Sequence, residues 1–422
     1  MKTAKKARKK RPATPSKAET PSLQERTKLR TVAVVILVGL VGLAALFFAG
    51  KRYSDHAVTE AASMIRMHQY DEALQRLLDA EQLGFNRDIV SILRSRVAWI
   101  RGDIAEFDQR VADAKAAGVT SRQIAFEQDL SKIRQGASRA YRSQLPKMLS
   151  RFPDEGPTTL QAFTMGFLAT GDVDGTAEVL AIWQDAEAKS PSVHYWIGIM
   201  HQTYGSDDDA INSFRTALQH SPEIHVARQA LADMLQKDLF DVAAEKHYAY
   251  LVQKNWGGQK VQAGLAICQL KCDKTADAVQ RIESLLASGS NNTEMIVLYA
   301  EHLLANDQNA KAIEVVQPIA DQQVDFAIQY ILATANTRLG NHEVAKQQFD
   351  YFAKRNRLFE RTQMMKLRYD AEPSAGLAKQ IAKNLMACRI QDASKWILIA
   401  GSSQSADEES RTMLRKYLER TK

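Results

Sequence analysis

Hydrophobic positions divide the chain into one continuous apolar segment and a long series of short amphipathic segments. The continuous segment, residues 31–50, contains no charged residue, and its one hydroxyl-bearing residue is Thr31 at the edge. A helix of about 20 residues rises about 30 Å, which matches the hydrocarbon thickness of a bilayer. A helix also satisfies its own backbone hydrogen bonds in lipid. The sequence therefore predicts a transmembrane helix over residues 31–50.

Three other kinds of segment can be similarly apolar. A cleavable signal peptide has a shorter apolar core and a small-x-small cleavage site, whereas residues 48–52 read Phe-Ala-Gly-Lys-Arg. A core helix of a soluble domain would be shorter or more amphipathic. A lipoprotein anchor would need a cysteine just after the segment, and the first cysteine is Cys268. An uncleaved membrane anchor is favoured, with cleavage as the open alternative.

The rest of the chain has helical periodicity and an internal repeat. Apolar residues recur at intervals of three and four, as in Ile197, Met200 and Tyr204, which is typical of amphipathic helices. On a longer scale, small or apolar residues recur mostly every 33 or 34 residues, and we name them the ladder residues: Ala73, Phe107, Tyr141, Ala177, Ala210, Ala244, Ala278, Ala312 and Ala345. Four glycines lie five residues before a ladder residue: Gly102, Gly136, Gly205 and Gly340. We expect each ladder residue at a close helix crossing and each glycine at a helix C-terminus.

Residues 191–222 carry the clearest motif. Counted from Pro191 as position 1, positions 8, 20, 24, 27 and 32 hold Gly198, Ala210, Phe214, Ala217 and Pro222. This segment resembles the tetratricopeptide repeat (TPR) family, although His194 and His201 occupy the aromatic positions of its pattern. The resemblance implies an all-α solenoid of helix pairs coiled into a right-handed superhelix. A HEAT-type array is the rival fold, but its period is longer.

The repeat predicts a domain organisation for the whole chain. About nine TPR-like units are expected over residues 54–357, most regular over 191–357 and degenerate over 120–190. An irregular break is expected over 358–373, followed by a tenth unit and a polar capping helix over 374–422. Open solenoids need such polar ends.

Charge is concentrated at the N-terminus. Residues 1–30 hold eleven Lys/Arg and two Asp/Glu, whereas residues 51–422 hold 45 Lys/Arg and 47 Asp/Glu. We expect residues 1–30 to form a disordered basic tail, and the positive-inside rule places it in the cytoplasm and the repeat body across the inner (plasma) membrane. Anionic lipid headgroups are candidate ligands of the tail. Because the body is not basic, no nucleic-acid partner is expected.

Catalytic and cofactor motifs are not found in the sequence. It contains no G-x-x-x-x-G-K-[ST], H-E-x-x-H or G-x-S-x-G pattern. Residues 171–175 (GDVDG) only partly match a calcium loop, and Cys268 and Cys272 are expected to be small buried side chains, with Cys388 unassigned. We therefore predict a non-enzymatic protein without a cofactor or a metal.

The TPR resemblance also implies a binding surface. In the family, positions 2, 5, 9 and 12 of the first helix of each pair face the ligand. Carried onto this sequence, they give the groove candidates Tyr195, Ile199, Gln202, Gln229, Asp233, Gln236, Lys260, Glu301, Tyr330 and Thr334. This mixture of apolar, amide and charged residues is typical of a protein- or peptide-binding groove. Position 5 holds no lysine, which argues against the family's clamp for chaperone carboxylates.

These features lead to one main functional hypothesis. A membrane-anchored scaffold would bind protein or peptide partners in the cell envelope, in an assembly, secretion or biogenesis complex. The alternatives are a periplasmic chaperone for exported chains and an enzyme accessory subunit, or an enzyme with its site in residues 120–190. A mitochondrial outer-membrane receptor is a further alternative for a eukaryotic source.

Overall fold

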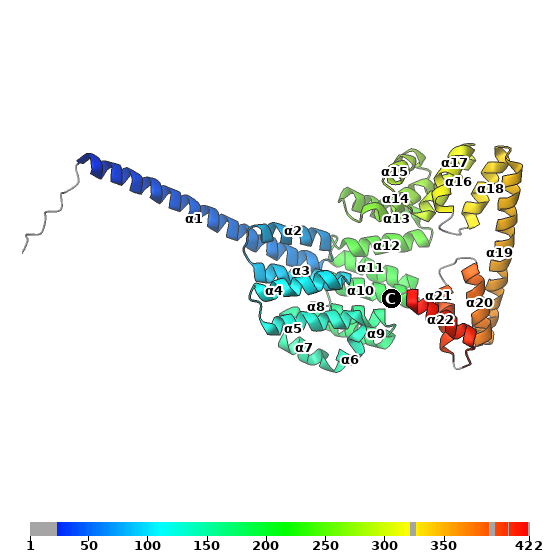
Figure 1. Cartoon of the computed structure of the whole chain (residues 1–422), viewed down its shortest axis with the longest axis horizontal. Helices are drawn as coiled ribbons and strands as arrows, with labels where there is room; N and C mark the ends of the chain where they lie inside the picture. Colours follow the sequence, from blue (N-terminus) through cyan, green and yellow to red (C-terminus); the bar gives the residue numbers. More distant parts are fainter. Residues whose placement is uncertain (1–22, 321–325, 388–392, 404, 421–422) are drawn as a thin grey trace, which may run out of the picture. The chain divides into compact units, whose positions relative to one another are not determined.

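The computed structural model describes residues 23–320, 326–387, 393–403 and 405–420. Every regular element in these residues is a helix, and the chain divides into two compact units, Met1–Val179 and Leu180–Lys422. Figure 1 shows the antiparallel helix pairs that build each unit. The predicted all-α, helix-pair architecture is confirmed.

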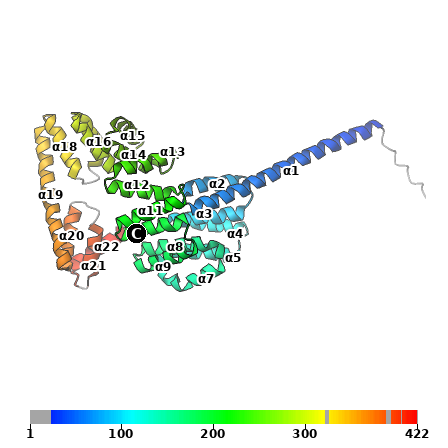
Figure 2. The same cartoon turned by 180° about the vertical axis from the view of Figure 1, so that it is seen from behind.

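Unit 1 begins with the longest helix, α1 (Leu23–Arg66), of 44 residues. The two views of Figures 1 and 2 show its N-terminal half projecting from the unit and its C-terminal half packed beside α2. Residues 34–49 are exposed, whereas Ser54, Ala57, Ala61 and Ile65 are buried against the repeats. One helix therefore contains both the apolar segment and the first repeat helix.

The tail prediction is corrected in part. Residues 1–22 lie outside the described residues, but residues 23–30, predicted to be disordered, form the first two turns of α1. This stretch, LQERTKLR, consists largely of good helix formers. It continues the apolar helix because adding a residue to an existing helix needs no new nucleation.

The remaining helices of unit 1 pair in chain order and become irregular after α5. The helices are α2 (Tyr70–Gln82), α3 (Arg87–Arg101), α4 (Ile104–Ala116), α5 (Ser121–Lys132), α6 (Ser138–Tyr141), α7 (Leu145–Arg151), α8 (Gly156–Ala169) and α9 (Val173–Ala186), which crosses into unit 2. Between α5 and α6 lies a π-helical turn, Ile133–Ala137, in which Gly136 has φ 108°. A β-carbon on Gly166 would lie 2.1 Å from the Ile133 carbonyl oxygen, so only glycine permits this crossing.

Unit 2 contains the regular repeats. Its helices are α10 (Pro191–Tyr204), α11 (Asp207–His220), α12 (His225–Lys237), α13 (Asp241–Gln253), α14 (Gly258–Lys271), α15 (Thr275–Ala287), α16 (Thr293–Ala305), α17 (Asn309–Ala320), α18 (Phe326–Arg338), α19 (His342–Ala371), α20 (Ala375–Ala387), α21 (Ala393–Ser402) and α22 (Glu408–Arg420). A continuous core follows α14 to α18, and a second core lies between α20 and α21 around Ile381, Leu385 and Trp396.

The structure differs from the prediction of an irregular break at 358–373. Helix α19 runs through it for 30 residues and ends at Ala371. The repeat period stops there, but the helix does not, because no glycine or proline interrupts residues 342–371. Leu358–Ala371 then packs its inner side against the α20–α21 core through Met365 and Tyr369.

The ladder residues lie where helices approach closely. Ala210, Ala244, Ala278 and Ala312 are fully buried. One assignment is wrong: Ala177 is exposed, and the buried residue of that repeat is its neighbour Thr176. Thr176 is 34 residues before Ala210, so the correct residue restores the period.

A left-handed residue ends the first helix of most pairs, five positions before the ladder residue. The residues with positive φ at this position are His68, Gly102, Gly136, Gly171, Gly205, Leu239, Asp273, Asp307 and Gly340. Glycine, asparagine and aspartate adopt this conformation readily. The expected role of the four predicted glycines as helix terminators is consistent with their φ values of 79°, 108°, 109° and 78°.

Candidate functional site

A polar pocket of about 410 Å³ lies in unit 2 between α12, α14 and the start of α16. This volume is within the range of about 300–1,000 Å³ that is common for ligand sites. The pocket is lined by Asp233, Gln236, Lys237, Leu239, Tyr248, Lys260, Gly264, Ile267, Lys271, Asn292 and Glu294. We name this set the α12–α14 pocket.

Ion pairs between the first helices of successive helix pairs form the walls of the pocket. Lys260 Nζ lies 2.8 Å from Asp233 Oδ2, and Lys271 Nζ lies 3.6 Å from Glu294 Oε1. Gln236 Nε2 donates to Glu294 Oε1 at 3.3 Å. Each pair joins residues at least 23 positions apart, so the walls belong to the packed array and not to one helix. The charged groups are thereby held in place before any ligand arrives.

Tyr248 supports the back of the pocket from α13. Its hydroxyl donates to Asp233 Oδ1 at 2.6 Å and lies 3.0 Å from Gln236 Oε1. Burial, followed by the neighbouring Asp233 carboxylate, raises the pKa of Tyr248 well above its usual range. A β-carbon on Gly264 would lie 2.6 Å from the Tyr248 ring. Glycine at 264 therefore lets the ring pack flush against α14 and brings the hydroxyl to Asp233.

Leu239 is the most unusual residue of the pocket. It ends α12 with φ 63°, in the left-handed region that a side chain with a β-carbon enters at a cost of about 1–2 kcal/mol. Leu239 is 76% exposed, and the nearby Phe240 and Val242 are 59% and 62% exposed. The equivalent positions of the other unit 2 repeats hold glycine or aspartate: Gly205, Asp273, Asp307 and Gly340. A leucine in this strained and exposed conformation does not stabilise the fold, but it places an apolar side chain on the pocket rim.

The structure brings three of the sequence-predicted groove residues together. Asp233, Gln236 and Lys260 line the α12–α14 pocket. Gln229 does not line the pocket; its Oε1 lies 3.6 Å from the position of a β-carbon on Gly257, just before α14. Helix α12 therefore contributes Asp233 and Gln236 to this pocket.

The other predicted residues lie outside this pocket. Tyr195 is half-buried, with its ring 5.3 Å from that of Trp196 and 6.1 Å from that of Phe214, and burial raises its pKa to about 12. Gln202 is exposed but donates to Met234 Sδ at 3.3 Å. Ile199 and Thr334 are half-buried, and Glu301 and Tyr330 are exposed. Tyr195 thus serves mainly the packing of its own repeat.

Sequence reasoning missed part of the pocket. Leu239, Lys237 and Asn292 lie at helix ends and Tyr248 lies on the second helix of its pair, whereas the family's ligand-facing positions lie within first helices. A signal for Leu239 was present: it lies five residues before ladder residue Ala244, where glycine is expected. A leucine where the repeat pattern predicts glycine is the feature that distinguishes this position in the sequence.

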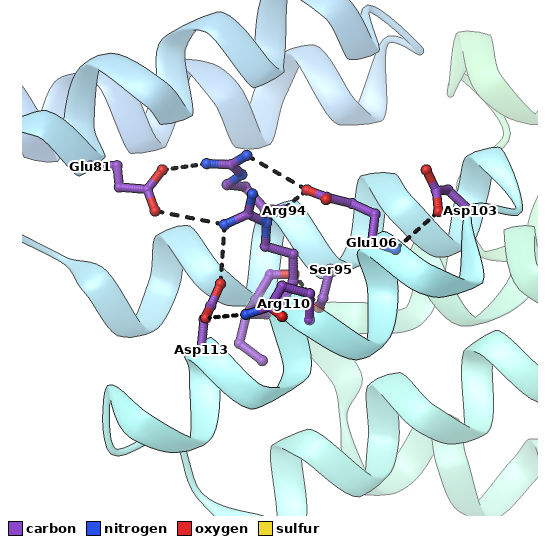
Figure 3. A network of polar contacts seen from close by, with 9 residues as sticks. Glu81, Arg94, Ser95, Asp103, Glu106, Arg110 and Asp113 are labelled. Atoms are coloured by element: carbon purple, nitrogen blue, oxygen red, sulfur yellow. Dashed lines mark hydrogen bonds and ion pairs between the residues drawn. The ribbon is translucent and has the colours of Figure 1, made fainter.

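A second polar cluster lies in unit 1 and is shown in Figure 3. Arg94 pairs with Glu81 and lies 3.6 Å from Glu106 Oε1. Arg110 Nε lies 2.7 Å from the same Glu106 oxygen, and its Nη1 lies 3.1 Å from Asp113 Oδ2. Two guanidinium groups and three carboxylates therefore link α2, α3 and α4. The cluster contains no nucleophile, and its contacts serve to hold three helices together.

The remaining chemical candidates have structural contacts. In the GDVDG stretch, Asp172 Oδ1 accepts from the Gly175 amide at 3.0 Å and Oδ2 accepts from Arg139 at 2.6 Å, which is how an N-terminal helix cap behaves. Cys268 is buried, and burial raises its pKa to about 12, so it is a protonated and unreactive thiol. Cys388 lies outside the described residues. Among the described residues there is no group of three His, Cys, Asp or Glu side chains placed to bind a metal ion.

One helix in the described residues is long and apolar enough to cross a membrane. It covers Val34–Arg66, with a mean hydropathy of 2.4 in its most apolar window, and none of that window is buried in the fold. A signal sequence would have the same properties.

The chain is an all-α helix-pair repeat protein that resembles tetratricopeptide-repeat proteins. No protein-family model and no curated protein matches its sequence. Among solved structures, a tetratricopeptide repeat protein from Parabacteroides merdae is 15% identical, with 61% of this chain and 97% of that chain covered and a TM-score of 0.39. The Cut9–Hcn1 hetero-tetramer of APC/C is 12% identical, with 90% and 74% covered and a TM-score of 0.44. PilF of Pseudomonas aeruginosa is 13% identical, with 60% and 99% covered and a TM-score of 0.33.

Proposed function

We propose that this protein is a membrane-anchored, non-enzymatic scaffold that binds a peptide segment of a protein partner in the α12–α14 pocket. The observation that carries the proposal is Leu239, an exposed leucine in a left-handed conformation on the pocket rim. Selection for stability alone would favour glycine, asparagine or aspartate there. A leucine that costs stability is explained by a contact made outside this chain.

The pocket chemistry supports a peptide ligand. Leu239, Phe240 and Val242 offer exposed apolar surface of the kind that marks binding sites. Beside them, Lys260 and Asp233 present one charge of each sign, and the Gln236 side chain can bond to a peptide backbone. An extended segment with an apolar anchor side chain between polar residues would satisfy both regions.

The N-terminal helix supports anchoring in the cell envelope. Residues 34–49 of its apolar segment are exposed in this chain. A bilayer can bury them without leaving backbone groups unpaired, because a helix forms its own backbone hydrogen bonds. The eleven cationic residues in 1–30 favour a cytoplasmic N-terminus, with the repeats across the membrane.

Protease digestion of sealed, right-side-out vesicles tests this orientation. The added protease should degrade the repeats and spare the N-terminal tail. Repeats protected from the protease would indicate the opposite orientation.

Anionic lipid headgroups are the proposed ligands of the tail. A peptide of residues 1–30 should bind vesicles that contain anionic lipid and dissociate as salt is raised, because its charge is screened. Equal binding to neutral vesicles would contradict this part of the proposal.

Site-specific photo-crosslinking in living cells tests the partner site. A photoreactive amino acid replaces Lys260, whose side chain is 67% exposed at the pocket. The matched control replaces Lys246, which is exposed on α13 and does not line the pocket. One discrete adduct at position 260, absent at 246, is the expected result.

Other outcomes lead to other functions. A broad smear of adducts at position 260 would favour the chaperone alternative, since many exported chains would then occupy the pocket. A discrete adduct with an enzyme would favour the accessory-subunit alternative. No adduct at 260, or the same adducts at 260 and 246, would remove the α12–α14 pocket as the partner site.

A further inference from the structure

We propose that the turn between α2 and α3, residues 83–86, is a second membrane contact that inserts Phe85 into the lipid interface beside the anchor. This inference rests on the proposed membrane anchoring by α1 and adds a specific element of unit 1 to it. The partner is the bilayer itself, and the geometry of α1 identifies it.

The position of Phe85 is fixed by two contacts with the apolar segment. Its ring centroid lies 5.1 Å from that of Phe47, with an angle of 77° between the ring planes. A β-carbon on Gly50 would lie 3.3 Å from Phe85 Cε2, so the ring also reaches the last residue of the segment. Phe47 and Gly50 lie about 4.5 Å apart along the helix axis. If Phe47 is in lipid, Phe85 is at the same depth.

The chain around this contact is suited to a membrane interface. Aromatic side chains are preferred at the boundary between hydrocarbon and headgroups. Phe48 and Tyr53 are exposed on α1 within three residues of Gly50, the residue that the Phe85 ring reaches. Leu83 is an exposed apolar residue of the turn itself. The exposed cations Lys51, Arg52 and Arg87 flank this surface, where anionic headgroups would neutralise them.

The turn is held rigidly to α1. Asn86 has φ 54°, and its Nδ2 donates to Asp55 Oδ1 at 2.7 Å and to Ser54 Oγ at 3.2 Å. Gly84 adopts φ 74°, which gives the turn the second left-handed residue that it needs. Since α1 continues unbroken from the apolar segment to Ser54, these bonds fix Phe85 against the anchor. Two contact points, one helix and one turn, would then restrain how unit 1 is oriented at the membrane.

Quenching of tryptophan fluorescence by brominated lipids tests the inference on the full chain in lipid vesicles. Three variants are compared with the unsubstituted protein, whose own five tryptophans supply the background. Phe85→Trp probes the turn, and Phe48→Trp probes the apolar segment. Ile104→Trp is the matched control, because Ile104 is an exposed apolar residue that begins α4, just beyond the end of α3 that lies about 22 Å along that helix from the turn.

The expected result is strong additional quenching for Phe48→Trp and Phe85→Trp, and none for Ile104→Trp. Quenching at 48 without quenching at 85 would overturn the inference and leave the anchor intact. The absence of additional quenching at both position 48 and position 85 would show that α1 does not anchor the chain in the membrane. Equal quenching at 85 and 104 would also overturn the inference, because the contact would then not be specific to the turn.

Discussion

At the scale of single residues, Leu239 shows a conflict between stability and binding. Its φ of 63° is tolerated by glycine or asparagine and costs leucine about 1 kcal/mol or more. At the same time, it supplies exposed apolar surface beside Phe240 at the pocket rim. The two properties can be separated by substitution.

We expect Leu239→Asn to stabilise the fold and weaken partner capture. The free energy of unfolding should rise by about 1 kcal/mol, because asparagine accepts the left-handed conformation. Denaturant unfolding measures the change in stability, and the yield of the photo-crosslinked adduct at position 260 measures partner capture. Asp273→Asn, at the equivalent position of the next repeat, is the control that should change neither. A stabilised variant with full adduct yield would show that Leu239 has no role in binding.

His68 is the residue through which we expect acid to destabilise unit 1. It is buried, its Nδ1 lies 2.8 Å from the Tyr70 hydroxyl, and burial lowers its pKa to about 4. The unfolded chain, with an ordinary pKa of about 6.5, then binds more protons between these two values. The contribution of His68 to stability is therefore complete above pH 6.5 and is lost as the pH falls toward 4.

The predicted loss from this histidine is about 2 kcal/mol between pH 7.5 and pH 5. His68→Asn keeps the left-handed conformation and cannot titrate, so its stability should fall less over the same interval. Denaturant unfolding of both proteins at the two pH values gives the comparison. Identical losses would show that His68 does not cause the acid sensitivity.

At the scale of helices, a buried ion pair links α3 to α5. Arg96, with 8% of its side chain exposed, has Nη2 2.5 Å from Glu127 Oε1, and Glu127 is fully buried. Glu127 Oε2 also accepts from Trp99 Nε1 at 2.9 Å, and Arg96 Nη1 lies 2.9 Å from Glu155 Oε2. Although burial opposes it, the two carboxylates raise the pKa of Arg96 further above its usual range.

We expect Glu127→Ala to destabilise unit 1 by about 3–5 kcal/mol, because it leaves the Arg96 guanidinium buried with only Glu155 to balance it. The matched control is Glu178→Ala, which removes a pair with Arg142 in which both side chains are about half exposed. That change should cost less than about 1 kcal/mol. The denaturant midpoints of both variants measure these losses. Equal losses would mean that burial does not increase the contribution of the Arg96–Glu127 pair to stability.

At the scale of the whole molecule, α1 joins the proposed anchor to unit 1 without a flexible linker. The helix is continuous from Leu23 to Arg66, and Lys51 and Arg52 are exposed within it. Proteases need several residues of extended chain, so a continuous helix protects such sites. Rigid coupling is therefore a property that can be measured at these two residues.

Insertion of two glycines after Arg52 should increase trypsin cleavage at Lys51 and Arg52 severalfold in the vesicle-bound protein. Each glycine lowers helix stability by about 1 kcal/mol relative to alanine. Insertion of two alanines is the matched control, since it shifts the helix register equally but preserves the helix. Rapid cleavage of the unaltered protein would contradict the continuous helix.

Much of the fold follows from the sequence because its causes are local. The interval of 33–34 residues between ladder residues such as Ala210 and Ala244 predicted the helix pairs, and Gly205 marked a helix end. The prediction of Ala177 as a ladder residue was wrong. It rested on the small size of alanine and an interval of 33, whereas Thr176, at an interval of 34, is the residue buried in the packing. The repeat period does not predict the helix at 358–371, because the period ends before this stretch while the helix continues through it.

The sequence by itself determined the apolar segment, the helical periodicity, the repeat and the charge of the tail, because each is a property of neighbouring residues. Only the tertiary structure decided which side chains meet. It brought Lys260 to Asp233 on the preceding helix pair, withdrew Tyr195 into its own repeat, and placed Phe85 against Phe47. Such contacts depend on the angles at which helices cross and on the conformations of the turns, and the interval between repeats in the sequence does not specify either.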